Sequence, residues 1–148
     1  MIKSKKLTKF KNIRHAFFNR LDGKFTGVFK SLNCGPISTD NKKDILKNLE
    51  IIKKRIYTKS ERIILLNQIH SNKFHFINKT SKLLKNKFEG DALITNKKNL
   101  PIAVLTADCA PIFLHDEKTK MIAAIHAGWK GAYKDILTRV VNFMIKKG

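Results

Sequence analysis

Apolar residues in the second half of the chain come in short runs separated by polar turns. Four runs follow one another closely: 91–95 (DALIT), 101–106 (PIAVLT), 110–115 (APIFLH) and 121–126 (MIAAIH). Short apolar runs bounded by turn residues are typical of buried β-strands. We therefore predict four strands here. Residues 62–70 (RIILLNQIH) and 73–78 (KFHFIN) predict two more, whereas 80–90 has the polar composition of a solvent-exposed excursion.

Helical spacing occurs in two other segments. Over residues 41–56, which Asp40 is expected to cap, one side carries apolar residues: Ile45, Leu46, Leu49, Ile52 and Ile56. A second amphipathic helix is predicted over 132–147, with apolar positions Ile136, Leu137, Val140, Val141, Met144 and Ile145. Residues 13–33 favour short strands with turns. A helix, clustered strands and a final helix favour an α+β fold over regular βαβ alternation.

Length and composition set the broad class of the protein. The chain has 148 residues with 43% hydrophobic residues, which is enough for one compact domain with a core. No apolar run reaches the roughly 18–20 residues of a membrane helix. The basic N-terminus lacks the apolar stretch of a secretory signal. We expect a cytoplasmic protein without a membrane partner.

The net charge is strongly positive, at +20 from 31 basic and 11 acidic residues. Such a charge raises the alternative of a non-enzymatic basic domain that binds nucleic acid or membrane surfaces. The excess is mostly lysine, however, and it is spread along the whole chain. No nucleic-acid-binding module or sheet with interleaved basic and aromatic residues is recognisable. We therefore predict no specific nucleic-acid partner.

Three side chains with metal-binding chemistry lie at predicted strand ends. His70 and His126 close two of the predicted strands, and Cys109 lies in the turn between two others. One cysteine and two histidines suit a catalytic zinc ion with an open fourth position, and the same donors suit copper. The alternative is two hydrogen-bonded core histidines and a buried thiol. The second cysteine, Cys34, is not expected to be a ligand, and two cysteines do not make a disulfide scaffold.

Four motifs occur in the order NQIHS, EGDALIT, LTADCAPIFLHD and IHAGWKG, and HAFFNR and SLNCG precede them. Together they resemble the YfiH family, also called the laccase-domain or multicopper polyphenol oxidase family, from about Arg14 to the end of the chain. The resemblance implies an α+β fold with mixed sheets packed between helices in four layers (αββα). It also implies that His70, Cys109 and His126 bind a metal, usually zinc, with copper as the alternative.

The activity that the resemblance implies is phosphorolysis of adenosine, inosine or methylthioadenosine to a free base and ribose 1-phosphate. Adenosine deamination is a second implied activity. Asp108 and Cys109 are the expected catalytic residues: Cys109 as a metal-bound thiolate and Asp108 to orient a ligand or relay a proton. The alternative role for Asp108 is that of a turn residue. The partners implied are a purine nucleoside and phosphate.

Four further residues are expected to bind substrate: Arg20, Ser31, Asn33 and Lys130. For Ser31 and Asn33 the alternative is a local turn, and for Arg20 it is a surface salt bridge. Lys130 stands where the family usually has arginine, so it keeps the charge but loses the planar fork that binds an oxyanion in a bidentate manner. Trp129 is expected to pack beside the site.

Two further expectations concern the extent and the chemistry of the protein. Residues 1–148 are expected to form a single domain that is incomplete at its C-terminus, because family members continue beyond this point. A copper-dependent phenol oxidase and a peptidoglycan-editing hydrolase remain the alternative activities. The sequence leaves the oligomeric state open.

Overall fold

The computed structural model describes residues 1–24, 26–36, 38–78 and 88–148. It divides into two compact units, Met1–Arg62 and Ile63–Gly148, and each is described by itself. Most of the predicted excursion over 80–90 lies outside the described residues. The prediction of a single domain over residues 1–148 stays a prediction.

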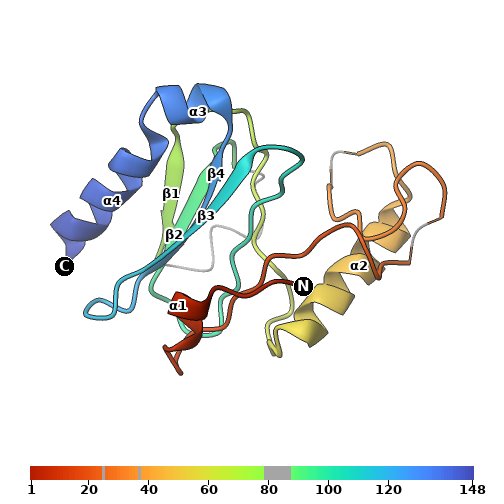
Figure 1. Cartoon of the computed structure of the whole chain (residues 1–148), viewed down its shortest axis with the longest axis horizontal. Coiled ribbons are helices and arrows are strands. Elements are labelled where there is room, and N and C mark those ends of the chain that lie inside the picture. The colour runs from red at the N-terminus through yellow and green to blue at the C-terminus, as the bar shows by residue number, and fades with distance from the viewer. Residues whose placement is uncertain (25, 37, 79–87) are drawn as a thin grey trace. The chain divides into compact units, whose positions relative to one another are not determined.

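The second unit is built on a four-stranded mixed sheet (Figure 1). Its strands are β1 (Phe74–Ile77), β2 (Ala92–Thr95), β3 (Ala110–His115) and β4 (Ile122–Ala127), in the order β1-β2-β4-β3. β1 pairs with β2 in parallel, and β4 pairs with both β2 and β3 in antiparallel register. This arrangement confirms the predicted α+β class and four of the predicted strands.

Both faces of β2 are covered, because successive side chains of a strand point to opposite faces. Ala92 and Ile94 join a core cluster with Ile125 and with the helix residues Ile136 and Val140. Leu93 instead joins a second cluster, with Ile64, Leu66 and Ile77. The centre of the sheet is therefore buried on both faces. This packing fixes the strands, and with them the positions of the polar side chains at the strand ends.

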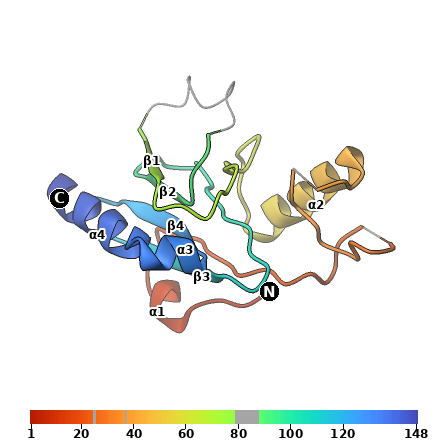
Figure 2. The same cartoon turned by 90° about the horizontal axis from the view of Figure 1, so that it is seen from above.

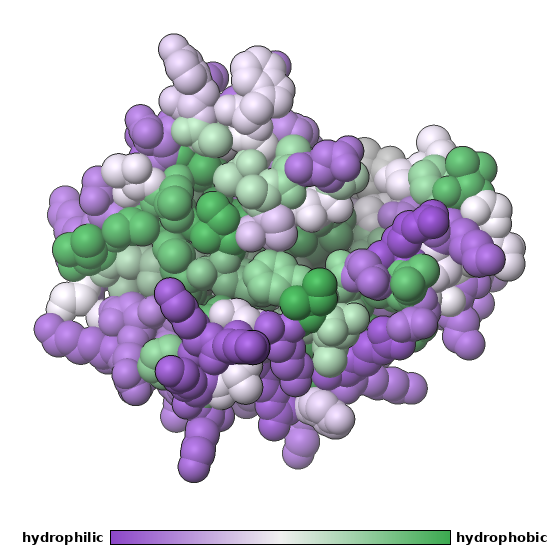
Figure 3. Space-filling model, viewed as in Figure 1, coloured by the Kyte–Doolittle hydropathy of each residue, from purple (hydrophilic) through white to green (hydrophobic). Residues whose placement is uncertain are grey.

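The chain leaves β4 into two helices, α3 (Trp129–Tyr133) and α4 (Ile136–Lys147), and Figure 2 shows α4 lying along the sheet. The space-filling view shows apolar surface over α4 and β1 (Figure 3). Phe143 packs there against Phe74 and Phe76, with ring centroids 5.1 and 5.2 Å apart.

The helix predicted over 132–147 is confirmed over 136–147, but its predicted start is wrong. Asp135 adopts a left-handed conformation with φ 58°, which interrupts the helix between α3 and α4. The break lets Ile136 begin a new helix whose buried side carries Ile136, Val140 and Met144. Leu137 and Ile145, predicted on the same apolar side, are 39% and 70% exposed.

The strands predicted over 62–70 and 101–106 are also wrong. These segments form isolated parallel bridges, such as that between Ile64 and Ile102, instead of a continuous ladder. Further along these two segments, the Gln68 side chain makes the hydrogen bonds that a paired strand would make. Its Nε2 donates to the Leu105 carbonyl and its Oε1 accepts from the Leu105 amide, both at 2.7 Å. The apolar pattern there reflects burial rather than pairing.

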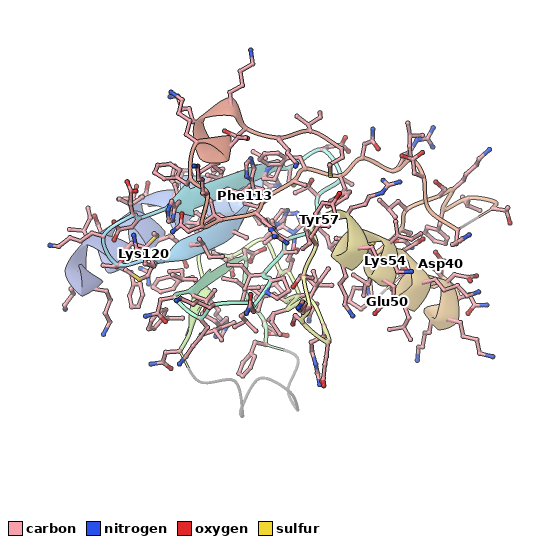
Figure 4. The ribbon with its side chains drawn as sticks, turned by 90° about the horizontal axis from the view of Figure 1, so that it is seen from below. Asp40, Glu50, Lys54, Tyr57, Phe113 and Lys120 are labelled. Carbon is pink, nitrogen blue, oxygen red and sulfur yellow. The ribbon has the colours of Figure 1, made fainter. Side chains whose placement is uncertain are left out.

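The first unit contains α1 (Lys5–Thr8) and α2 (Lys42–Arg55). Asn41 caps α2, in place of the predicted Asp40, by accepting a hydrogen bond from the Lys43 amide. Ile45 is buried as predicted, but Leu46 is 63% exposed. Figure 4 shows Glu50 and Lys54 projecting from the same helix.

The described residues of 13–33 do not form the predicted short strands; Phe17 makes an isolated bridge with Ile2. The buried side chain of Asn48 organises this irregular region instead. It accepts from the Lys24 amide and donates to the carbonyls of Ser31 and Asn33, at 2.8–3.1 Å. In the described part of the chain, no helix is long and apolar enough to cross a membrane.

Candidate metal centre

His70, Cys109 and His126 converge at one end of the sheet in the second unit. Their ligand atoms all lie within 4.8 Å of one another. The Cys109 sulfur is 3.7 Å from His70 Nε2, and the two imidazole rings meet edge to face with centroids 4.8 Å apart. Segments far apart in the sequence thus place two nitrogens and one sulfur around a common point.

His126 is the buried member of this cluster and lies in β4, with 3% of its surface exposed. Its Nδ1 lies 2.8 Å from Oδ1 of Asp91, and its amide donates to the Asp91 carbonyl at 2.7 Å. Burial raises the pKa of the Asp91 carboxyl group, but hydrogen bonds from His126, Ser71 and His70 outweigh burial and hold that pKa below its ordinary value.

His70 is the exposed member, and it does not end a strand as predicted. Its backbone adopts a left-handed conformation, with φ 54°. The amides of His70 and Ser71 donate to the Asp91 carboxylate at 3.0 and 2.6 Å. The ring of His70 therefore lies on a turn that is hydrogen-bonded to Asp91, the residue immediately before β2.

Cys109 is half-buried and lies directly before β3, as the sequence predicted. The residue before it, Asp108, is exposed and has a φ of 72°. Gln68, two residues before His70, holds the chain at Leu105 through two hydrogen bonds. This link brings the segment leading into Cys109 alongside the segment that carries His70.

Gly128 lies against the cluster at the N-cap of α3. A Cβ atom at this position would lie 2.5 Å from Cδ2 of His70 and 3.3 Å from the Cys109 sulfur. Gly131 is close to the same turn, since a Cβ there would lie 2.7 Å from the Ser71 carbonyl oxygen. Close packing thus accounts for two glycines of the HAGWKG motif.

Lys130 and Trp129 follow Gly128 in α3. Both are exposed, and the Lys130 ammonium group lies 5.3 Å from the centroid of the Trp129 ring. The expectation that Trp129 packs beside the site is wrong, because 73% of its surface is exposed. Lys130 therefore presents its charge to solvent two residues from Gly128.

Arg20, Ser31 and Asn33 belong to the first unit. The Ser31 hydroxyl donates to the Arg20 carbonyl at 3.0 Å. The Asn33 side chain accepts from the Gly35 amide and donates to Ser38 and Asp40. The Asn33 side chain thus makes local turn contacts, whereas the Ser31 hydroxyl links two segments of the first unit. The role of the three residues in substrate binding stays a prediction.

The separation of Cys109 and His70 fits a tetrahedral zinc ion. Zinc–sulfur and zinc–nitrogen bonds of about 2.3 and 2.0–2.1 Å place neighbouring sulfur and nitrogen ligands about 3.6 Å apart. The observed distance between Cys109 and His70 is 3.7 Å. Thiolate and imidazole donors also suit copper, so the residues indicate a soft or borderline metal without choosing between the two.

Sequence reasoning missed Asp91, Ser71 and Gln68, which hold the segments that carry the cluster. Each lies inside a motif that the sequence analysis quoted, NQIHS or EGDALIT. The available signal for Asp91 was an acidic residue immediately before a mostly apolar predicted strand, because a buried carboxylate requires hydrogen-bond partners.

Comparison with known proteins identifies related sequences and folds. Residues 14–148 match the family described as multi-copper polyphenol oxidoreductase laccase. A purine nucleoside phosphorylase of Rickettsia prowazekii is 40% identical over 73% of this chain and 43% of its own length. One from Bacteroides thetaiotaomicron is 31% identical over 95% of this chain and 56% of its own length.

Solved structures agree with the fold. A Neisseria meningitidis protein matches with a TM-score of 0.73 and 30% identity, over 84% of this chain and 49% of that protein. The Bacillus licheniformis protein YfiH matches with a TM-score of 0.79 and 24% identity, over 86% of this chain and 50% of that protein. The chain therefore spans about half the length of the relatives that it matches.

Proposed function

Because this chain belongs to the multi-copper polyphenol oxidoreductase laccase family, we propose that it carries the metal centre of a purine nucleoside phosphorylase. Its substrates are adenosine, inosine or methylthioadenosine together with phosphate. Hydrolytic deamination of adenosine is its second activity. The names of the relatives from Rickettsia prowazekii and Bacteroides thetaiotaomicron support the phosphorylase assignment.

The observation that carries this proposal is the cluster of His70, Cys109 and His126, whose ligand atoms lie within 4.8 Å of one another. We assign these three residues as the metal ligands and zinc as the metal. The cluster supplies three protein donors, which is the number found in catalytic zinc sites that keep a fourth position for water or substrate. A bound zinc ion acts as a Lewis acid toward a ligand oxygen and lowers the pKa of coordinated water to about 7.

The residues around the cluster have complementary roles in this proposal. Asp108 is exposed beside Cys109, where its carboxylate accepts a proton from, or orients, a bound substrate hydroxyl. Lys130 supplies a positive charge for the phosphate, as a point charge rather than a bidentate fork. Arg20, Ser31 and Asn33 are proposed as further substrate contacts on the strength of the family resemblance.

A copper-dependent phenol oxidase is the second candidate, since one thiolate and two imidazoles also bind copper. Multicopper electron transfer requires further groups of ligands. Among the described residues, His70, Cys109 and His126 form the one group of three or more His, Cys, Asp or Glu side chains placed to hold an ion. This favours single-metal chemistry. It does not separate phosphorolysis from a peptidoglycan-editing hydrolysis, whereas formation of adenine in the assay below would support phosphorolysis.

The test is chromatography of adenosine after incubation with the purified, zinc-loaded chain, with and without phosphate. Adenine that appears only with phosphate supports phosphorolysis, and inosine supports deamination. The Cys109→Ala variant should lose both activities and the bound zinc. Cys34→Ala is the matched control, because Cys34 is a buried thiol outside the cluster. A wild-type chain that binds zinc but forms neither product would contradict the proposed activity.

A further inference from the structure

Asp91 is connected to both histidines of the cluster. Its carboxylate is fully buried, at 0% exposure, and accepts hydrogen bonds from four groups. Oδ1 binds the His70 amide at 3.0 Å and lies 2.8 Å from Nδ1 of His126. Oδ2 accepts from the amide and the hydroxyl of Ser71, at 2.6 and 2.7 Å.

We propose that Asp91 is a positioning residue of the metal centre, which fixes the ring tautomer of His126 and the backbone conformation that presents His70. This inference rests on the proposed function, since it takes His70 and His126 as ligands. It adds a residue that is not itself a ligand, and it assigns to that residue two separate effects on the site.

The first effect concerns the ring of His126. Both carboxylate oxygens of Asp91 accept from backbone amides, and an ionised carboxylate has only acceptor sites. The contact at 2.8 Å therefore has Nδ1 of His126 as its donor. A neutral imidazole protonated at Nδ1 carries its free lone pair at Nε2, which is the form that a metal binds. In the metal-free protein, Asp91 thus leaves Nε2 of His126 as the nitrogen that is available to bind a metal.

The second effect concerns the backbone of His70. A non-glycine residue rarely adopts a positive φ, and His70 has a φ of 54°. Two consecutive amides, those of His70 and Ser71, point at the same carboxylate. These bonds hold the turn in a conformation that the chain does not favour by itself. The His70 ring is thereby kept where Nε2 lies 3.7 Å from the Cys109 sulfur.

The backbone of Asp91 is anchored independently of its side chain. Its amide donates to the Lys73 carbonyl at 2.9 Å, and its carbonyl accepts from the His126 amide at 2.7 Å. The conservative change Asp91→Asn therefore keeps the backbone contacts and the size of the side chain. It removes the negative charge and turns one oxygen into an amide donor, which cannot accept from the groups that face it.

The experiment compares the wild type with Asp91→Asn and with Ser71→Ala. Ser71→Ala removes one hydrogen bond to Oδ2 but leaves the contact of Oδ1 with His126, so it is the matched control for a purely structural loss. Two readouts are measured besides thermal unfolding: the ¹⁵N chemical shifts of the His126 ring in the metal-free chain, and the zinc affinity by competition with a chromogenic chelator.

We expect the wild type and Ser71→Ala to show the Nδ1-protonated tautomer. Asp91→Asn should lose this preference. Its zinc affinity should fall about 10- to 100-fold, as is typical when the hydrogen-bond partner of a metal-binding histidine is removed. Equal zinc affinities in wild type and Asp91→Asn would overturn the inference, as would equal losses in Asp91→Asn and Ser71→Ala. An Nε2-protonated His126 in the wild type would overturn it even if Asp91→Asn fails to fold. A wild type that shows the Nδ1 tautomer but binds no zinc would refute the proposed function and leave the tautomer assignment supported.

Discussion

Adding a single methyl group at Gly128 should abolish tight metal binding without unfolding the protein. Gly128 has φ −70° and ψ 161°, an extended conformation that alanine adopts freely. The effect of Gly128→Ala therefore arises from contact and not from backbone strain. The new Cβ atom would lie 2.5 Å from Cδ2 of His70, against 3.4–4 Å for an ordinary van der Waals contact.

The magnitude follows from that overlap. The His70 ring must move by about 1 Å, whereas metal–ligand distances tolerate about 0.2 Å. We expect zinc affinity to fall at least about 100-fold. At a free zinc concentration 100 times the wild-type Kd, zinc stabilises the wild type by about 2.7 kcal/mol, and the same concentration stabilises Gly128→Ala by about 0.4 kcal/mol.

The assay is thermal unfolding with and without zinc, combined with a chelator competition for the affinity. In the metal-free chain the exposed His70 ring can rotate away, so the free energy of unfolding should stay within about 1 kcal/mol of the wild type. Gly131→Ala is the contrasting control. Its Cβ would meet the Ser71 carbonyl oxygen at 2.7 Å, a backbone atom that cannot rotate away, so this variant should be destabilised even without zinc.

Two results would refute the reasoning. Wild-type zinc affinity in Gly128→Ala would show that His70 does not need its observed position and is not a ligand. Equal destabilisation of Gly128→Ala with and without zinc would show that the methyl group disturbs the fold rather than the metal centre.

Three further outcomes are expected. Burial raises the pKa of the Cys34 thiol to about 11, so iodoacetamide at pH 8 should alkylate Cys109 in the metal-free chain and leave Cys34 unmodified, as peptide mass spectrometry would show. Asn48→Ala removes three hydrogen bonds from a fully buried side chain and should cost about 3 kcal/mol in urea unfolding; a loss below about 1 kcal/mol would contradict its organising role. Val140→Ala, at a fully buried position, should cost about 2 kcal/mol, whereas Ile145→Ala, 70% exposed, should change the stability by less than about 0.5 kcal/mol.

Local patterns predicted the strands that pair continuously and the helix of the first unit. Residues 73–78, 91–95 and 110–115 contain β1, β2 and β3, residues 121–126 cover β4 except for Ala127, and residues 41–56 contain α2. Residues 62–70 and 101–106 have the same apolar character but form isolated bridges. Apolar periodicity reports burial, and burial in this protein is reached both by paired strands and by an irregular segment held by the side chain of Gln68.

Residue types and the order of the motifs are enough to recognise the chemistry of the candidate site and the family of the chain. His70, Cys109 and His126 are recognisable because each lies in a short sequence motif, and a thiol and two imidazoles are residue types that bind metals. How they meet depends on the folded chain: on the left-handed turn at His70, the close approach of Gly128, and the carboxylate of Asp91 that contacts both histidines. These features are contacts between segments distant in sequence. The hydrogen-bond directions that define them exist only once the sheet has brought the segments together.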